Sequence, residues 1–235
     1  MRVIFPDKHN QPSSFCRLLK RLPLCIFISS CVSPVFSYIL HKIFRTQGVL
    51  EIFALSSQGV QKGYLWQFLT YPFFTADSLC IHKEQCFEIT QRFLIRNTLD
   101  FLFFYKATDF IIRKLGVWSF LTLVSIQIPS IGFLIWCCMK LFGTPQAFFG
   151  PESLICSTML VWIFLDPEKR LGLGPIPLTI SRKWGFLILL GFYFCILIFS
   201  GSPLIFLGSI LSLGLAWFFC KKEKIPNPYT ASLRF

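Results

Sequence analysis

The chain has 235 residues, of which 54% are hydrophobic and 14% are charged, and its formal net charge is +12. Soluble domains carry about 25% charged residues, so this composition excludes an ordinary water-soluble domain. The basic residues cluster beside apolar stretches and form no basic aromatic groove, which argues against nucleic acid as a partner.

Six apolar stretches are each long enough to cross a bilayer as a helix. They lie at residues 22–40, 93–112, 117–139, 150–165, 184–200 and 203–220. Backbone polar groups in hydrocarbon must be satisfied within their own segment, and the alternation of barrel strands is absent, so each stretch predicts an α-helix. We therefore predict an all-α membrane protein with one six-helix domain at 22–220, a basic tail at 1–21 and a second tail at 221–235.

The positions of the basic residues predict how these spans are oriented. The segments on the side of the N-terminus hold Arg2, Lys8, Arg17, Lys20, Arg21, Arg113, Lys114, Lys169, Arg170, Arg182, Lys183, Lys221, Lys222, Lys224 and Arg234. The opposite side or its boundary holds Lys42, Arg45, Lys62, Lys83, Arg92 and Lys140. Because cytoplasmic segments are enriched in Lys and Arg, we expect a multi-pass protein of the cell or inner membrane with both termini cytoplasmic.

The first apolar stretch has an alternative interpretation. Basic residues at 17–21, an apolar run and then residues 29–31 (SSC) are similar to a signal peptide or a weak lipoprotein box. The region before the run is long for a signal, and the run continues past Pro34 to Leu40. A retained helix is therefore the preferred interpretation.

The loop at residues 41–92 is the longest connection, and long ordered loops usually have a function. It is amphipathic, and its centre at 63–74 reads GYLWQFLTYPFF. We expect Trp66, Tyr71 and Phe73 to pack this loop against the helices at the outer headgroup level.

Two cysteines, Cys80 and Cys86, flank His82 in the same loop. This spacing matches no common metal site, and we predict neither a metal nor a cofactor. Free thiols and a disulfide across the loop both remain open.

The second span is the most polar, with Arg96, Asn97, Asp100, Lys106 and Asp109. Charges in a membrane normally face the bundle interior or water and pair with one another. The spacing predicts three pairs, namely Arg96 with Asp100, Lys106 with Asp109, and Asp109 with Arg113. These pairs either lock the bundle or line a polar cavity around Asn97.

Several segments resemble rhomboid intramembrane serine proteases. Residues 66–73 (WQFLTYPF) are similar to the first-loop signature Trp-Gln/Arg-x-x-Thr-Tyr-x-Phe, and 93–97 (FLIRN) stand where that family has His-x-x-x-Asn. Residues 109–116 resemble the end of that helix, and Pro167 with 175–177 (PIP) suits the loop between helices four and five. Residues 150–153 (GPES) occupy the place of the Gly-x-Ser-Gly nucleophile motif, and 206–209 (FLGS) the place of His-x-x-Gly. Order, spacing and orientation agree over about 62–220.

The catalytic residues that this family requires are missing from the matching positions. A serine protease of this kind needs a Ser nucleophile and a His that takes its proton. The nucleophile position holds Glu152, with Ser153 beside it, and the base position holds Phe206. The histidine of the second helix is replaced by Phe93, so only Asn97 remains as an oxyanion candidate.

Glu152 has two interpretations. It lies in the first turn of a helix, where the helix dipole favours an anion, so it can simply stabilise that end. Alternatively it lies in a vestigial cavity near Arg96 or Asn97.

The resemblance thus implies a six-helix bundle without protease activity that binds transmembrane protein segments within the lipid bilayer. The candidate binding residues are Trp66, Gln67, Tyr71, Phe73, Arg96, Asn97 and Asp100. Two alternatives remain, an active serine endopeptidase with an unusual site at Ser153 or Ser157, and a small transporter or channel that uses the charges of the second span. The sequence gives no oligomeric state.

Overall fold

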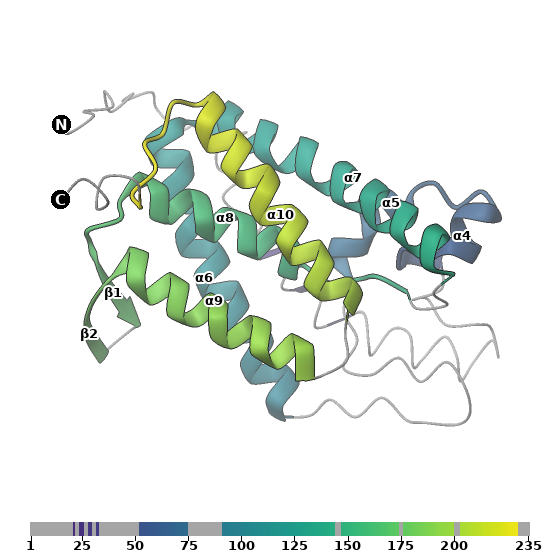
Figure 1. Cartoon of the computed structure of the whole chain (residues 1–235), viewed down its shortest axis with the longest axis horizontal. Coiled ribbons are helices and arrows are strands. Elements are labelled where there is room, and N and C mark those ends of the chain that lie inside the picture. Colours follow the sequence, from purple (N-terminus) through teal and green to yellow (C-terminus); the bar gives the residue numbers. More distant parts are fainter. Residues whose placement is uncertain are drawn as a thin grey trace.

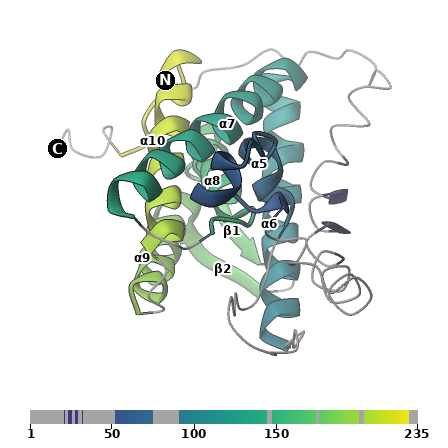
Figure 2. The ribbon, with the colours of Figure 1, turned by 90° about the vertical axis from the view of Figure 1, so that its right-hand side faces the viewer.

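The computed structural model describes residues 52–74, 91–143, 147–173, 176–199 and 203–229, together with single residues and pairs between positions 21 and 32. In these ranges the chain is mostly helical, and five long helices form a bundle with short helices against it (Figures 1 and 2). Most of the predicted first span and the predictions for Cys80, His82 and Cys86 lie outside the described residues.

The long helices coincide with the five apolar stretches predicted after the long loop. They are α6 (Gln91–Leu115), α7 (Val117–Phe142), α8 (Glu152–Leu165), α9 (Arg182–Phe199) and α10 (Pro203–Lys222). In the described part of the chain, α7 and α10 are long and apolar enough to cross a membrane by length and composition, which supports a membrane location.

The short helices belong to the loop that precedes α6. They are α4 (Ser57–Gln61), α5 (Gln67–Thr70) and the 3₁₀ turn η1 (Tyr71–Phe73). Figure 2 shows α5 lying against the side of the bundle near α7. Gly132 of α7 gives this loop room, because a Cβ there would come within 3.3 Å of Phe68 and Tyr71.

Helix α8 is the centre of the bundle. It has 14 residues, and all of them except Glu152, Cys156 and Leu165 are buried. It packs most extensively against α10 and α6. At 14 residues, α8 is shorter than the roughly 20 residues that a helix needs to cross a bilayer alone.

A β-hairpin follows α8, so the expectation of an all-α fold is wrong in this detail. Strands β1 (Arg170–Leu173) and β2 (Ile176–Ser181) pair antiparallel, with Gly172 opposite Pro177. Glycines and prolines disfavour helix in this segment. A two-stranded sheet has only edge strands, so it tolerates a proline that cannot donate a hydrogen bond.

The hairpin leads into a buried ion pair at the start of α9. Arg182 Nη1 lies 3.2 Å from Asp166 Oδ2, and its guanidinium lies 4.5 Å from the ring centre of Trp162. Arg182 is buried, and its stacking on the Trp162 ring together with its ion pair to Asp166 offsets the loss of hydration of its guanidinium.

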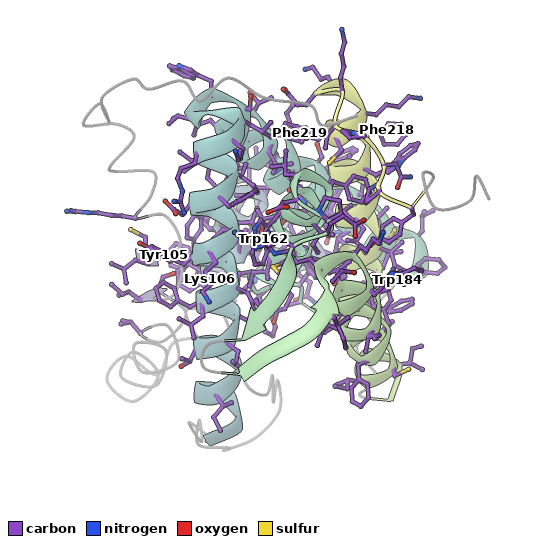
Figure 3. The ribbon with its side chains drawn as sticks, turned by 90° about the vertical axis from the view of Figure 1, so that its left-hand side faces the viewer. Tyr105, Lys106, Trp162, Trp184, Phe218 and Phe219 are labelled. Atoms are coloured by element: carbon purple, nitrogen blue, oxygen red, sulfur yellow. The ribbon has the colours of Figure 1, made fainter. Side chains whose placement is uncertain are left out.

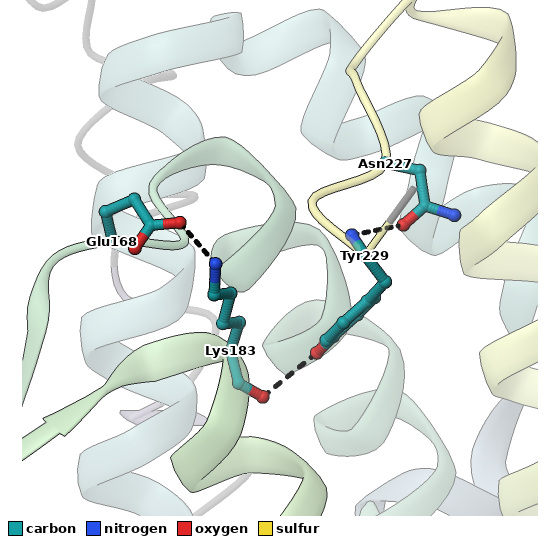
Figure 4. A network of polar contacts seen from close by, with 4 residues as sticks. All are labelled: Glu168, Lys183, Asn227 and Tyr229. Carbon is teal, nitrogen blue, oxygen red and sulfur yellow. Dashed lines mark hydrogen bonds and ion pairs between the residues drawn. The ribbon is translucent and has the colours of Figure 1, made fainter. Parts of the chain in front are cut away.

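The segment after α10 folds back over the place where β2 joins α9 (Figure 4). Tyr229 donates its hydroxyl proton to the Lys183 carbonyl at 3.0 Å, and its N–H donates to Asn227 Oδ1 at 3.0 Å. Lys183 Nζ also pairs with Glu168 Oε1 at 2.5 Å. We call this the hairpin end of the bundle.

Candidate functional site

The side chains of the predicted loop motif hold the loop together. Trp66 Nε1 and Gln67 Nε2 both donate to the Ile52 carbonyl, at 2.9 and 3.2 Å. Gln67 Oε1 accepts the backbone N–H of Ser56 at 3.1 Å. The motif therefore satisfies backbone groups of the preceding turn, which would otherwise need partners of their own.

The buried amide of Gln67 connects the two parts of this loop. Its side chain is completely buried, and it fills the space beside Gly59, where a Cβ would come within 2.7 Å of Gln67 Cδ. Thr70 completes the arrangement, because its hydroxyl donates to the Phe53 carbonyl at 2.8 Å. These contacts fix the direction in which the next residue, Tyr71, enters the bundle.

Tyr71 connects the loop to two other parts of the bundle. Its hydroxyl donates to the Ile128 carbonyl in α7 at 3.2 Å, and its carbonyl accepts the N–H of Gly150 at 3.0 Å. Its ring centre lies 5.1 Å from that of Phe148. Burial raises the pKa of Tyr71 well above its ordinary value, with the neighbouring Ser153 hydroxyl partly opposing the shift.

The segment that enters α8 is clamped between the loop and α10. Leu55 and Phe148 exchange two backbone hydrogen bonds, at 2.9 and 2.8 Å. The Phe148 ring then lies against Gly208 of α10, where a Cβ would come within 2.7 Å of it. The Gly-Pro-Glu-Ser turn at residues 150–153 is therefore held on two sides.

The turn itself presents Ser153 inward and Glu152 to a partly exposed position. Ser153 is 2% exposed, and its Oγ makes no hydrogen bond of normal geometry with a described residue, although it lies beside the Tyr71 hydroxyl. The Glu152 carboxylate folds back over Gly150, which has a φ of 101°. This left-handed turn requires glycine.

The sequence position of the expected base holds a phenylalanine that packs on another aromatic ring. Phe206 in α10 contacts Phe194 in α9 edge to face, with ring centres 5.1 Å apart. One turn further along α10, Ser209 donates to the Ile205 carbonyl at 2.9 Å. Because this uses the Ser209 proton, Tyr193 donates across the 3.3 Å between the two hydroxyl oxygens.

Polar groups from α6 and α8 lie within electrostatic range of this contact. The thiol of Cys156 in α8 lies beside the Ser209 hydroxyl, and the carboxylates of Glu152 and Asp100 are near enough to act electrostatically on Cys156 and Tyr193. We call these residues the polar cluster: Asp100, Glu152, Cys156, Tyr193 and Ser209. It comes from α6, α8, α9 and α10.

Asn97 lies one turn before Asp100 on α6. It is 5% exposed, and its Nδ2 has no hydrogen-bond partner among the described residues. The side chain of Arg96 lies outside the described residues, so its predicted pair with Asp100 stays a prediction. Of the other predicted pairs on this helix, that of Asp109 with Arg113 is confirmed.

Among the described residues, the arrangement offers hydrogen bonds but places no histidine beside Ser153. The three histidines of the chain, at 9, 41 and 82, lie outside the described residues. Tyr71 keeps its proton because its pKa is raised. Within the described ranges no group of three His, Cys, Asp or Glu residues is placed to hold a metal ion.

Trp66 differs from its expected role, because its ring is 44% exposed and stacks on Tyr64 rather than on the helices. Gln67 and Tyr71 are the buried residues instead, and Phe73 packs partly against the core. Sequence reasoning missed Tyr193 and the other hydroxyl and thiol groups of the cluster. Tyr193 is the one tyrosine in the apolar stretch 184–200, and a polar hydroxyl in such a stretch could have indicated a functional position.

Comparisons with protein-family models, with curated proteins and with solved structures find no match to this chain. The resemblance to rhomboid proteases therefore rests on the pattern of residues alone.

Proposed function

We propose that this protein is a six-span, rhomboid-like membrane protein without protease activity, which binds transmembrane segments of other proteins. In this proposal both termini are cytoplasmic. The main observation in its support is the hydrogen bond from the Gly150 N–H to the Tyr71 carbonyl. Through this bond the loop motif fixes the position of the turn at residues 150–153, which matches the nucleophile motif. The sequence position of the base holds Phe206, which is packed on Phe194.

The polar cluster supports binding of a membrane segment rather than of a soluble substrate. Polar side chains inside a membrane domain are costly, and they mark sites where helices exchange hydrogen bonds. Tyr193 of α9 is partly buried, and its hydroxyl lies against that of Ser209 in α10. A polar residue in a partner helix would meet donors and acceptors there.

The two helices beside α8 both present apolar surface to such a partner. Helices α6 and α9 both pack on α8, but they have no substantial contact with each other. Each presents exposed apolar side chains, for example Leu102 on α6 and Phe192 on α9. A single apolar helix would cover both faces and reach the polar cluster.

Site-specific cross-linking tests this proposal. A benzophenone amino acid replaces Phe192, which is 70% exposed on α9, or Phe133, which is 54% exposed on α7. The full chain is reconstituted in vesicles with a single-span substrate of rhomboid proteases. We expect cross-links from position 192 at several times the yield from position 133. Equal yields would mean non-specific contact in the bilayer and would refute the proposal.

One observation favours the alternative of an active serine endopeptidase. Ser153 has a buried hydroxyl without a normal hydrogen bond, next to the hydroxyl of Tyr71. A general base must reach the proton it removes and must itself be deprotonated, whereas the Tyr71 hydroxyl keeps its proton near neutral pH, as any tyrosine does, and its raised pKa reinforces this.

A further inference from the structure

The end of α10 carries a compact group of positive charges next to a tryptophan. Lys221, Lys222 and Lys224 are exposed, and the Lys221 ammonium lies 5.7 Å from the ring centre of Trp217. Glu223 is the acidic residue within this stretch, so three positive charges face one negative charge. The ring and the ammonium groups are the residue types that favour the headgroup level of a membrane.

A tight turn fixes where these lysines stand. The N–H of Ile225 donates to the Cys220 carbonyl at 2.8 Å, and that of Lys224 donates to the Lys221 carbonyl at 3.2 Å. Lys224 adopts a left-handed conformation with a φ of 56°, and the Ile225 side chain is buried. This is a helix-ending motif with its apolar contact, so the lysines are part of the folded domain.

An apolar stripe runs along α10 toward the lysines. Ile210, Trp217 and Phe218 are 42%, 41% and 61% exposed, and Trp217 contacts Phe218 with ring centres 5.1 Å apart. Gly214 lies between them, and no atom lies within 4 Å of the place of its missing Cβ. Figure 3 shows Phe218, and also Trp184 of α9, on the outside of the bundle.

The length of this stripe matches one leaflet of a membrane. From Ile210 to Lys221 the helix rises about 16 Å at 1.5 Å per residue. Half of a hydrocarbon core of about 30 Å is about 15 Å. The groups along this face therefore follow the same order as the parts of a phospholipid. Apolar side chains lie at the level of an acyl chain, the indole lies at the interface, and the ammonium groups lie at the level of the headgroup.

We propose that this face of α10 binds an anionic phospholipid, with an acyl chain along the stripe past Gly214 and the phosphate among the three lysines. A net negative headgroup is favoured over a zwitterionic one because the lysines outnumber the single acid. The site is independent of the proposed function, since Ser209, the polar cluster residue of α10, is buried on a different face of the helix.

Quenching of tryptophan fluorescence by bromine-labelled lipids tests this proposal. The full chain is reconstituted in phosphatidylcholine vesicles with brominated phosphatidylglycerol or brominated phosphatidylcholine. The signal of Trp217 is the difference between the chain and Trp217→Phe. We expect an association constant at least about fivefold higher for phosphatidylglycerol, since each lysine near a membrane contributes about 1 kcal/mol, which corresponds to roughly fivefold.

Two variants make the result specific. The triple variant Lys221→Gln, Lys222→Gln and Lys224→Gln should bind both lipids equally, with unchanged helicity. The control Lys62→Gln with Lys140→Gln removes two exposed lysines elsewhere and should keep the preference. Equal binding of both lipids by the unchanged chain, or a preference that survives in the triple variant, would overturn the proposal. So would displacement of the lipid by millimolar inorganic phosphate, which would indicate a site for the free anion.

Discussion

The backbone carbonyl of Tyr71 accepts a hydrogen bond from the backbone N–H of Gly150 at 3.0 Å, and this bond joins the long loop to the turn that begins α8. Two other contacts of Tyr71, its hydroxyl bond to Ile128 and its ring contact with Phe148, hold it in place. The position of the turn at 150–153 is thus determined by a residue of the loop. We expect substitutions in the loop to disturb the start of α8.

Replacing Gly59 with alanine should destabilise the fold. A Cβ at Gly59 would overlap the buried Gln67 side chain, whose amide holds the loop closed, and overpacking typically costs 1–3 kcal/mol. The control is Gly191→Ala in α9, where no atom lies within 4 Å of the new Cβ. Thermal unfolding in detergent should show a clear loss for Gly59→Ala only. Equal melting temperatures for both variants would mean that Gln67 moves freely.

Replacing Tyr71 with phenylalanine should cost about 1 kcal/mol, because it removes one buried hydrogen bond to the Ile128 carbonyl. The control Tyr105→Phe changes a tyrosine that is 46% exposed on α6 and should be nearly neutral. Chemical denaturation in detergent would measure both. A loss for Tyr105→Phe as large as that for Tyr71→Phe would contradict the assignment of the bond.

The same variant should also change how stability depends on alkaline pH. Burial raises the pKa of Tyr71 above its ordinary value of 10.0, so folding favours the protonated form. This contribution to stability is complete below about pH 10 and is lost as the pH rises above it. Tyr71→Phe should therefore lose less stability than the unchanged chain between pH 10 and pH 11. Parallel curves over that interval would show that the hydroxyl is not buried.

Two neighbouring ion pairs at the hairpin end should differ in strength. Asp166→Asn removes the counter-charge of the buried Arg182, and hydrogen bonds to charged groups contribute about 1.5–3 kcal/mol. Glu168→Gln weakens an exposed pair with Lys183, which is worth at most about 1 kcal/mol. Unfolding of both variants in one detergent would compare them. A larger effect of Glu168→Gln would refute this ranking.

The predicted pair of Arg96 with Asp100 should show coupling in a double-mutant cycle. Removing one member of a buried pair leaves an uncompensated charge, so Arg96→Met or Asp100→Leu alone should cost more than the double variant. The matched control is Asp109→Asn with Arg113→Gln, an exposed pair of the same spacing on α6. Its coupling should be about 0.5 kcal/mol or less. Additive effects at Arg96 and Asp100 would place the two charges in separate surroundings.

The helices of the bundle could be predicted from the sequence because each contains a long run of mostly apolar residues, although charged side chains interrupt the run in α6. Gly116 and Gly143 adopt positive φ values directly after α6 and α7, and each stands four residues beyond the end of a predicted run. The pair of Asp109 with Arg113 could also be predicted, since spacing within one helix determines it. Local patterns were sufficient for these features.

The candidate site could be predicted only in part, because it depends on contacts between distant segments. The burial of Gln67 rather than Trp66 follows from how the loop backbone near Ile52 folds over the amide. The contact of Tyr193 with Ser209 joins two helices, and no spacing within either helix indicates it. The hairpin was missed because its short strands contain glycine and proline.

We propose that the turn at Ser153 lies in a rhomboid-like setting without protease chemistry. The most direct measurement incubates the reconstituted full chain with a fluorophosphonate probe and a single-span rhomboid substrate, beside Ser153→Ala. We predict no labelling and no cleavage for either protein, because Phe206 cannot take a proton and Tyr71 keeps its own. Labelling or cleavage that disappears in Ser153→Ala would contradict the account and identify a serine endopeptidase.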